Sequence, residues 1–189
     1  RLGKGATGRI AEVATKAPPI DILRAELSHL ANVGTDTAAL DPAAEFDKAI
    51  RIMSQVPTIV AAIGRIVEGK DPVHQDTSLS HTANFFLMLT GKAPPTNVER
   101  TLNALFVLYA EHGFSASTFV ARAIASTQSD LHSAVIGAIG ALKGWHHGGA
   151  NLTSIELLET VKDVAHVDDA LARWHVARHK FPGFGHPVY

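Results

Sequence analysis

Apolar residues recur three and four positions apart along most of the chain, which is the spacing of one buried face of an α-helix. Ile22, Leu27 and Leu30 show this spacing before the pattern ends at 32–34. No stretch alternates β-branched and polar residues between hairpin turns, so strands are not expected. The fold class predicted is therefore all-α, with about eight or nine helices. Beyond residue 41, the helical segments expected are 42–56, 58–68, 79–89, 97–111, 115–126, 130–143, 155–164 and 167–178.

Proline and glycine set the expected ends of these helices. Residues 1–19 are expected to be loop-like apart from 10–17, and Asp21 is expected to cap the helix that follows the two prolines. Pro57 is expected to interrupt the apolar pattern that starts near residue 42, because an internal proline removes a helical hydrogen bond.

The most uniformly apolar segment, 130–143, is expected to be a central helix, with Gly137 and Gly140 allowing other helices to approach closely. After residue 150 the sequence changes to amphipathic segments with more charges. This change predicts a large helical domain over 1–150 and the beginning of a smaller helical domain over 151–189. The chain starts without methionine and stops directly after a turn-like segment, so both domains are expected to be incomplete.

Composition narrows the function classes. The 189 residues are 46% hydrophobic, carry a formal net charge of −1 and include no cysteine. Dispersed charge of this kind does not indicate a nucleic-acid partner. The lack of cysteine excludes disulfides and thiolate metal sites and fits a reducing compartment. No uninterrupted apolar run approaches the roughly 20 residues that cross a bilayer, so no membrane association and a cytoplasmic location are expected.

Three of the eleven histidines stand where a helical pattern ends beside glycine: His112, His147 and His186. Imidazoles at such breaks project into clefts, and they exchange or donate protons near neutral pH. The glycines at 148 and 149, which follow His147, are expected to let a substrate approach the backbone. The histidines without a supporting pattern are expected to be structural or solvent-facing: His29, His74, His132, His166, His175 and His179.

Other chemistries are poorly supported by the sequence. The three histidines show no zinc-binding spacing, so no metal site is expected. The serines at 115 and 117 lack a nucleophile-elbow pattern, and the glycines at 148 and 149 lack the lysine of a phosphate-binding loop. Hydrogen-bond and acid–base chemistry on carbonyl groups remains, in which imidazoles stabilise negative charge that develops on an enolate or alkoxide oxygen.

Five segments together resemble the citrate synthase superfamily, in the family's order and over nearly the whole chain. The resemblance implies an all-α enzyme, usually a homodimer, in which a smaller domain closes over the substrates. The segments are PPIDILR at 18–24, LSHTANF at 79–85, EHGFSASTF at 111–119, GALKGWHHGGAN at 140–151 and GFGHPVY at 183–189.

The resemblance also implies roles for the three histidines. His147 corresponds to the residue that hydrogen-bonds the acyl-CoA thioester oxygen and stabilises the enol. His186 corresponds to the residue that polarises the oxaloacetate carbonyl, and His112 to a further oxaloacetate contact. His146 stands where the family more often has a smaller or apolar residue, and is interpreted as a neighbour of the catalytic histidine.

The resemblance implies a condensation of acyl-CoA with oxaloacetate, as in citrate synthase or 2-methylcitrate synthase, with acetyl-CoA or propionyl-CoA as substrate and no bound cofactor. The GFGHPVY segment, with Pro187 where the family usually has arginine, resembles 2-methylcitrate synthases, which use propionyl-CoA. A citryl-CoA lyase on the same scaffold and a non-catalytic helical homologue remain alternatives. The family's catalytic aspartate and carboxylate-binding arginines lie beyond the last of these segments, so these 189 residues alone are expected to be inactive.

Overall fold

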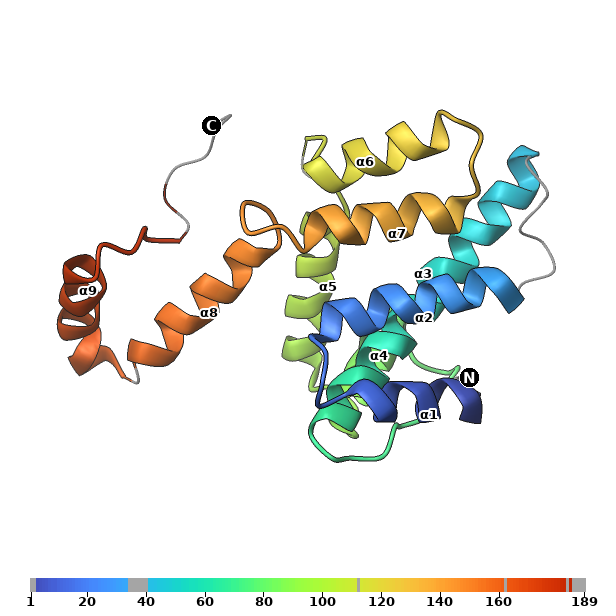
Figure 1. The fold of residues 1–189 in the computed structure, drawn as a ribbon. Coiled ribbons are helices and arrows are strands. Elements are labelled where there is room, and N and C mark those ends of the chain that lie inside the picture. Colours follow the sequence, from blue (N-terminus) through green and yellow to red (C-terminus); the bar gives the residue numbers. More distant parts are fainter. Residues whose placement is uncertain (1–2, 34–40, 112, 162, 183, 185–189) are drawn as a thin grey trace. The chain divides into compact units, whose positions relative to one another are not determined.

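The structure is a computed structural model that describes residues 3–33, 41–111, 113–161, 163–182 and 184. Within these ranges it contains nine α-helices, one short 3-10 helix and no strand, which confirms the predicted all-α class (Figure 1). The helices are α1 (Lys4–Val13), α2 (Pro19–Val33), α3 (Pro42–Val67), α4 (His81–Thr90), α5 (Thr96–Ala110), α6 (Ala116–Ala125), α7 (Leu131–Leu142), α8 (Gly149–Val161), the 3-10 helix (Val164–His166) and α9 (Val167–Val176).

The chain forms two compact units, residues 1–140 and residues 141–189. The first unit holds α1 to α6 and most of α7, and the second holds the end of α7, α8, the 3-10 helix and α9. The large and small domains predicted over 1–150 and 151–189 concern the complete protein, and that division stays a prediction.

Short polar side chains begin several of these helices. The Asp41 carboxylate accepts from the backbone N–H of Ala44 at the start of α3, and Ser80 and Ser115 cap α4 and α6 in the same way. Asp21 is not the cap that the sequence predicted. The carbonyl of Pro18 accepts the first backbone hydrogen bonds of α2, so Asp21 lies within the first turn.

Helix α3 is continuous through Pro57, so the predicted interruption is wrong. Proline lacks an N–H, which removes the usual helical hydrogen bond to the carbonyl of Met53. Burial of Ile52 and Ile59 on either side of the proline then anchors both halves of the helix in one core.

Because it is uninterrupted, α3 is also long and apolar enough to cross a membrane, judged by length and composition alone. A core helix of a soluble protein passes the same test. In this structure α3 supplies Ile52, Ile59 and Ile63 to the hydrophobic core.

The core of the first unit joins helices from both ends of that unit. Its buried members are Ile10, Ile22, Leu27, Ile52, Ile59, Ala62, Ile63 and Ile139. Ile10 is fully buried and lies in α1, a helix that the sequence analysis placed largely in a loop. The pair Arg9–Glu26 links α1 to α2 through two hydrogen bonds of 3.0 and 2.7 Å. Helix α1 contains Gly5 and Gly8, so tertiary contacts stabilise it more than local propensity does.

The two glycines of α7 differ in their surroundings. A Cβ atom on Gly137 would collide with Ile124 and touch Val120, so α6 and α7 approach closely at this point (Figure 1). Gly140 faces open space, with no atom within 4 Å of such a Cβ. The prediction of close helix approach is therefore confirmed for Gly137 and wrong for Gly140.

Candidate active site

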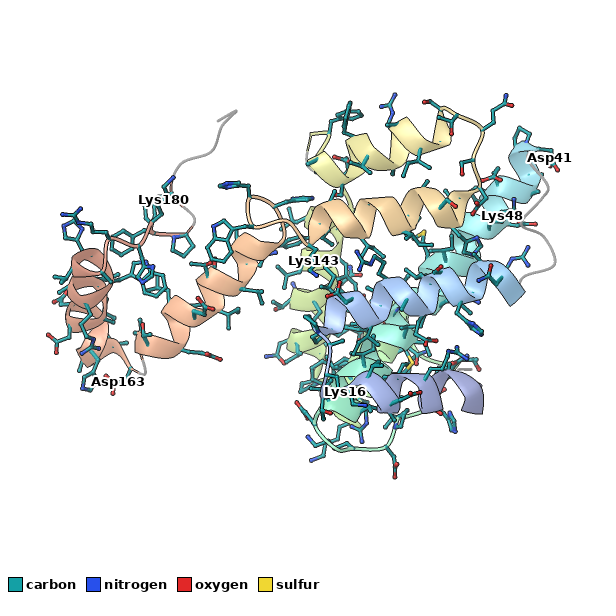
Figure 2. All side chains as sticks on the ribbon, viewed as in Figure 1. Lys16, Asp41, Lys48, Lys143, Asp163 and Lys180 are labelled. Carbon is teal, nitrogen blue, oxygen red and sulfur yellow. The ribbon has the colours of Figure 1, made fainter. Side chains whose placement is uncertain are left out.

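The histidine pair lies in a six-residue turn, 143–148, between α7 and α8. Lys143 marks the beginning of this turn in Figure 2. The carbonyl of Gly144 accepts two backbone hydrogen bonds, from His147 at 2.9 Å and from Gly149 at 3.1 Å. Gly144 in turn donates to the carbonyl of Ala141 at 3.0 Å. The turn is therefore folded onto itself by backbone hydrogen bonds, and His147 lies between its anchor points.

Three glycines make this tight turn possible. A Cβ atom on Gly144 or on Gly149 would lie 3.1 Å from a backbone carbonyl oxygen, of Ala141 and of Gly144 respectively. At Gly148 the Cβ would come well within 3.0 Å of the Leu142 carbonyl oxygen, an approach that real Cβ atoms essentially never show. The sequence predicted that the space beside Gly148 would be open to a substrate. The protein's own backbone fills this space instead.

The adjacent histidines differ in exposure. His146 is exposed, as is Trp145 before it, whereas His147 is partly buried and takes part in a further interaction. A partly covered imidazole has a more restricted orientation, which a hydrogen-bond donor to a developing oxyanion needs. This difference favours His147 over His146 as the chemically active residue of the pair.

The start of α8 places another polar group after the turn. The hydroxyl oxygen of Thr153 is buried and has no hydrogen-bond partner among the described residues, whereas the neighbouring Ser154 hydroxyl donates to the Ala150 carbonyl at 3.2 Å. An unpaired buried hydroxyl is uncommon in folded proteins and costs stability.

His112 and His186, the other two predicted site residues, lie outside the described residues. The structure therefore does not test whether the three histidines come together. No group of His, Asp and Glu suited to hold a metal ion occurs within the part of the chain that is described.

Glu111 and the residues from Phe114 to Thr118 form a hydrogen-bond network that the sequence pattern did not predict. The Glu111 carboxylate accepts from the backbone N–H of Phe114 at 2.7 Å and from the Thr118 hydroxyl at 2.9 Å. Ser115 adds a hydroxyl contact to Thr118 at 3.1 Å. The available signal was the spacing of Glu111, Ser115 and Thr118, since an acidic residue shortly before a serine-capped helix is well placed to bind its first turn.

Two successive left-handed residues shape the same segment. Gly113 has φ +76° and Phe114 has φ +71°, the second being a conformation that side-chain-bearing residues seldom adopt. The Phe114 ring packs edge-on against Phe119 and lies under the Arg122 guanidinium, 4.8 Å from its carbon. These contacts, together with the Glu111 hydrogen bonds, hold Phe114 in its unusual conformation.

The sequence matches a family profile described as "Citrate synthase, C-terminal domain" over residues 2–189. It is similar to a 2-methylcitrate synthase of Mycobacterium tuberculosis (strain Erdman), with 40% identity over 100% of this chain and 48% of the relative. It is also 40% identical to a citrate/2-methylcitrate synthase of Bacillus subtilis, over 90% of this chain and 46% of the relative. The chain thus spans about half the length of the relatives it matches.

The fold is similar to solved citrate synthase structures. The enzyme from Thermotoga maritima aligns with a TM-score of 0.77 and 35% identity, over 100% of this chain and 49% of that one. A citrate synthase from the archaeon Thermoplasma acidophilum, in a ternary complex with carboxymethyl coenzyme A and oxaloacetate, aligns with a TM-score of 0.87 over 100% of this chain and 50% of that one. At 24% identity, the second comparison concerns the fold alone.

Proposed function

Because the chain belongs to the citrate synthase family, we propose that the complete protein condenses an acyl-CoA with oxaloacetate. The reaction is a Claisen-type condensation followed by hydrolysis of the thioester, which releases coenzyme A. The observation that carries the proposal is the family match over residues 2–189, which includes the glycine-rich turn with His147.

His147 donates a hydrogen bond to the thioester oxygen in this proposal. Removing the proton next to a thioester leaves negative charge on that oxygen, and a positioned donor stabilises the resulting enol or enolate. The support for this role is the partial burial of His147 and the backbone hydrogen bonds that flank it. His186 polarises the oxaloacetate carbonyl and His112 contacts oxaloacetate, both on the basis of the family resemblance.

Propionyl-CoA and acetyl-CoA are the two candidate acyl donors. Relatives that carry the name 2-methylcitrate synthase, alone or together with citrate synthase, support propionyl-CoA, as does Pro187 in the GFGHPVY segment. Relatives named citrate synthase, such as that of Heyndrickxia coagulans at 39% identity, support acetyl-CoA.

The test is an assay of the complete protein with oxaloacetate and each acyl-CoA, following the release of free thiol. We expect thiol release that requires oxaloacetate, and the acyl-CoA with the higher kcat/KM identifies the enzyme subtype. No thiol release with either acyl-CoA would contradict the proposal. Thiol release that does not depend on oxaloacetate would indicate simple thioester hydrolysis instead.

We also propose that the complete protein is a homodimer. The C-terminal half of α5 exposes consecutive apolar side chains, with Val107, Leu108 and Tyr109 each about two-thirds or more accessible in this chain. Exposed apolar surface on a helix favours association with another element or subunit. Analytical ultracentrifugation of the complete protein tests this, since a monomer at micromolar concentration would contradict it.

A further inference from the structure

We propose that Gly148 is a positioning residue for His147. Gly148 determines the position of the His147 imidazole because it has no side chain, and not because its backbone is flexible. This inference rests on the proposed function, in which His147 binds the thioester oxygen. Gly148 itself touches no reacting atom in this proposal. It acts by letting the turn close against the end of α7.

The end of α7 leaves no space for a side chain at position 148. A Cβ atom there would meet the Leu142 backbone carbonyl oxygen well within 3.0 Å, and the Leu142 Cδ1 and Cγ atoms at 2.8 and 3.0 Å. The side-chain atoms of Leu142 can rotate away. The carbonyl oxygen cannot, because it belongs to the last residue of α7 and moves only with the helix end.

A positive φ is not the reason for glycine at position 148. Among the described glycines, only Gly69, Gly91 and Gly113 have a positive φ. Gly148 is therefore outside the positive-φ region that disfavours alanine. Replacing Gly148 with alanine changes the available space without demanding a forbidden backbone conformation.

The backbone hydrogen bonds of His147 lie directly beside this space. The His147 N–H donates to the Gly144 carbonyl at 2.9 Å, and the His147 carbonyl accepts from Ala150 at 3.1 Å. Gly149 donates to the same Gly144 carbonyl at 3.1 Å. Because residue 148 is enclosed by these bonds, a Cβ at this position must displace the peptide groups on both sides by at least about half an ångström.

A displacement of this size is large enough to affect catalysis. A misplacement of about 1 Å of a group that acts in the transition state costs on the order of 100-fold in rate. If His147 acts only on the developing enolate, then its displacement lowers kcat and leaves the KM for oxaloacetate nearly unchanged.

Three glycines near the turn form a graded series for the test. A Cβ at Gly148 collides with backbone, a Cβ at Gly149 lies 3.1 Å from the Gly144 carbonyl oxygen, and a Cβ at Gly140 meets no atom within 4 Å. Gly140 is exposed, and it provides a matched control because the same Gly→Ala change is made there in open space. All three variants are made in the complete protein.

We expect Gly148→Ala to lower kcat by about 30- to 100-fold, Gly149→Ala by less, and Gly140→Ala by under 2-fold, with the KM for oxaloacetate within about 3-fold of wild type in each. Circular dichroism and the thermal midpoint are measured alongside. Wild-type kcat in Gly148→Ala would overturn the inference. So would a rise in KM together with a loss of helicity, since that result indicates a structural role alone.

A second measurement does not depend on turnover. The imidazole resonances of the complete protein are recorded by NMR with labelled histidine, and His147 is assigned from the signal lost in His147→Asn. We expect Gly148→Ala to shift the His147 signals and Gly140→Ala to leave them in place. Unshifted signals would overturn the inference. A shift in a protein with no thiol release would leave the positioning intact and contradict only the proposed function.

Discussion

Identical residues in this chain lie in different surroundings. Gly140 and Gly148 are eight positions apart, yet one faces open space and the other lies against the end of α7. His146 and His147 are neighbours, yet one is exposed and the other is partly buried. At the scale of the residue, burial and neighbouring backbone atoms therefore distinguish residues of the same type, and the proposed roles of His147 and Gly148 rest on these differences.

His147→Ala in the complete enzyme is expected to lower kcat by about 100- to 1,000-fold, the usual effect of removing one donor to a developing oxyanion. His146→Ala is the matched control and is expected to change kcat by less than about 3-fold, because its exposed imidazole is less restricted in orientation. Steady-state kinetics with oxaloacetate and the preferred acyl-CoA measures both. Comparable losses in the two variants would mean that the wrong histidine of the pair has been assigned.

At the scale of the element, the ends and contact faces of α7 determine its stability. The Asp130 carboxylate accepts from the Ser133 backbone N–H at 3.0 Å and from its hydroxyl at 2.6 Å, so it caps the helix. Gly137 provides the contact with α6 through Ile124. Both features lie on the helix that leads directly into the turn with His147.

Gly137→Ala is expected to lower the free energy of unfolding by about 1–3 kcal/mol, because the added methyl group overpacks the contact with Ile124. Gly140→Ala is expected to raise it by about 0.5–1 kcal/mol, since alanine favours the helix and meets no other atom. Urea denaturation of the complete protein measures both. Adding Ile124→Val removes the colliding Cδ1 atom and should restore much of the loss, and an additive double variant would contradict this packing.

The pH dependence of the α7 cap follows from Asp130. Partial burial acts to raise the pKa of Asp130, but the hydrogen bonds from Ser133, together with smaller contributions from His132 and a backbone hydrogen bond, outweigh it and lower the pKa below its ordinary value. A lowered carboxyl pKa in the folded state stabilises the fold above the pKa of the unfolded chain. That contribution is lost as the pH falls through the folded-state value.

Ser133→Ala is therefore expected to raise the pKa of Asp130 and to destabilise the protein near neutral pH, with a smaller effect below about pH 3. A carboxyl-carbon NMR titration measures the pKa. Ser126→Ala is the control, because the Ser126 hydroxyl donates to the Ala123 carbonyl and not to a carboxylate. An unchanged Asp130 titration in Ser133→Ala would contradict the assignment of the cap.

At the scale of the molecule, the chain exposes many large apolar side chains. Phe46 and Met53 on α3 and Val107, Leu108 and Tyr109 on α5 are all highly accessible. The chain also spans about half the length of its relatives. We therefore expect other parts of the complete protein, or the second subunit of the proposed homodimer, to cover these helices.

Residues 1–189 expressed alone are therefore expected to bind a hydrophobic dye such as ANS several-fold more strongly, per molecule, than the complete protein does. Fluorescence titration at equal molar concentration measures the difference. The variant Leu108→Glu is expected to reduce dye binding to the isolated chain, because Leu108 is exposed. Leu27→Glu is not a suitable control, because Leu27 lies in the core. Equal dye binding by the two proteins would contradict this account.

The local helical pattern was predictable where local signals agree with tertiary packing. The helices at 79–89, 97–111, 115–126 and 130–143 were predicted to within a residue or two of α4, α5, α6 and α7. The prediction failed at α1, where buried Ile10 and the Arg9–Glu26 pair stabilise a glycine-containing segment, and at Pro57. In both places long-range packing outweighs local propensity, which a one-dimensional pattern does not contain.

The sequence by itself determined the helical class, the family and the turn in which His147 lies, because these depend on residue types and their spacing along the chain. Only the tertiary structure decided which histidine of the pair is partly buried and that a Cβ at residue 148 would meet the Leu142 carbonyl. These two properties depend on atoms that approach one another through folding. The Leu142 carbonyl lies against Gly148 because the turn closes on the end of α7, and sequence spacing does not carry that distance.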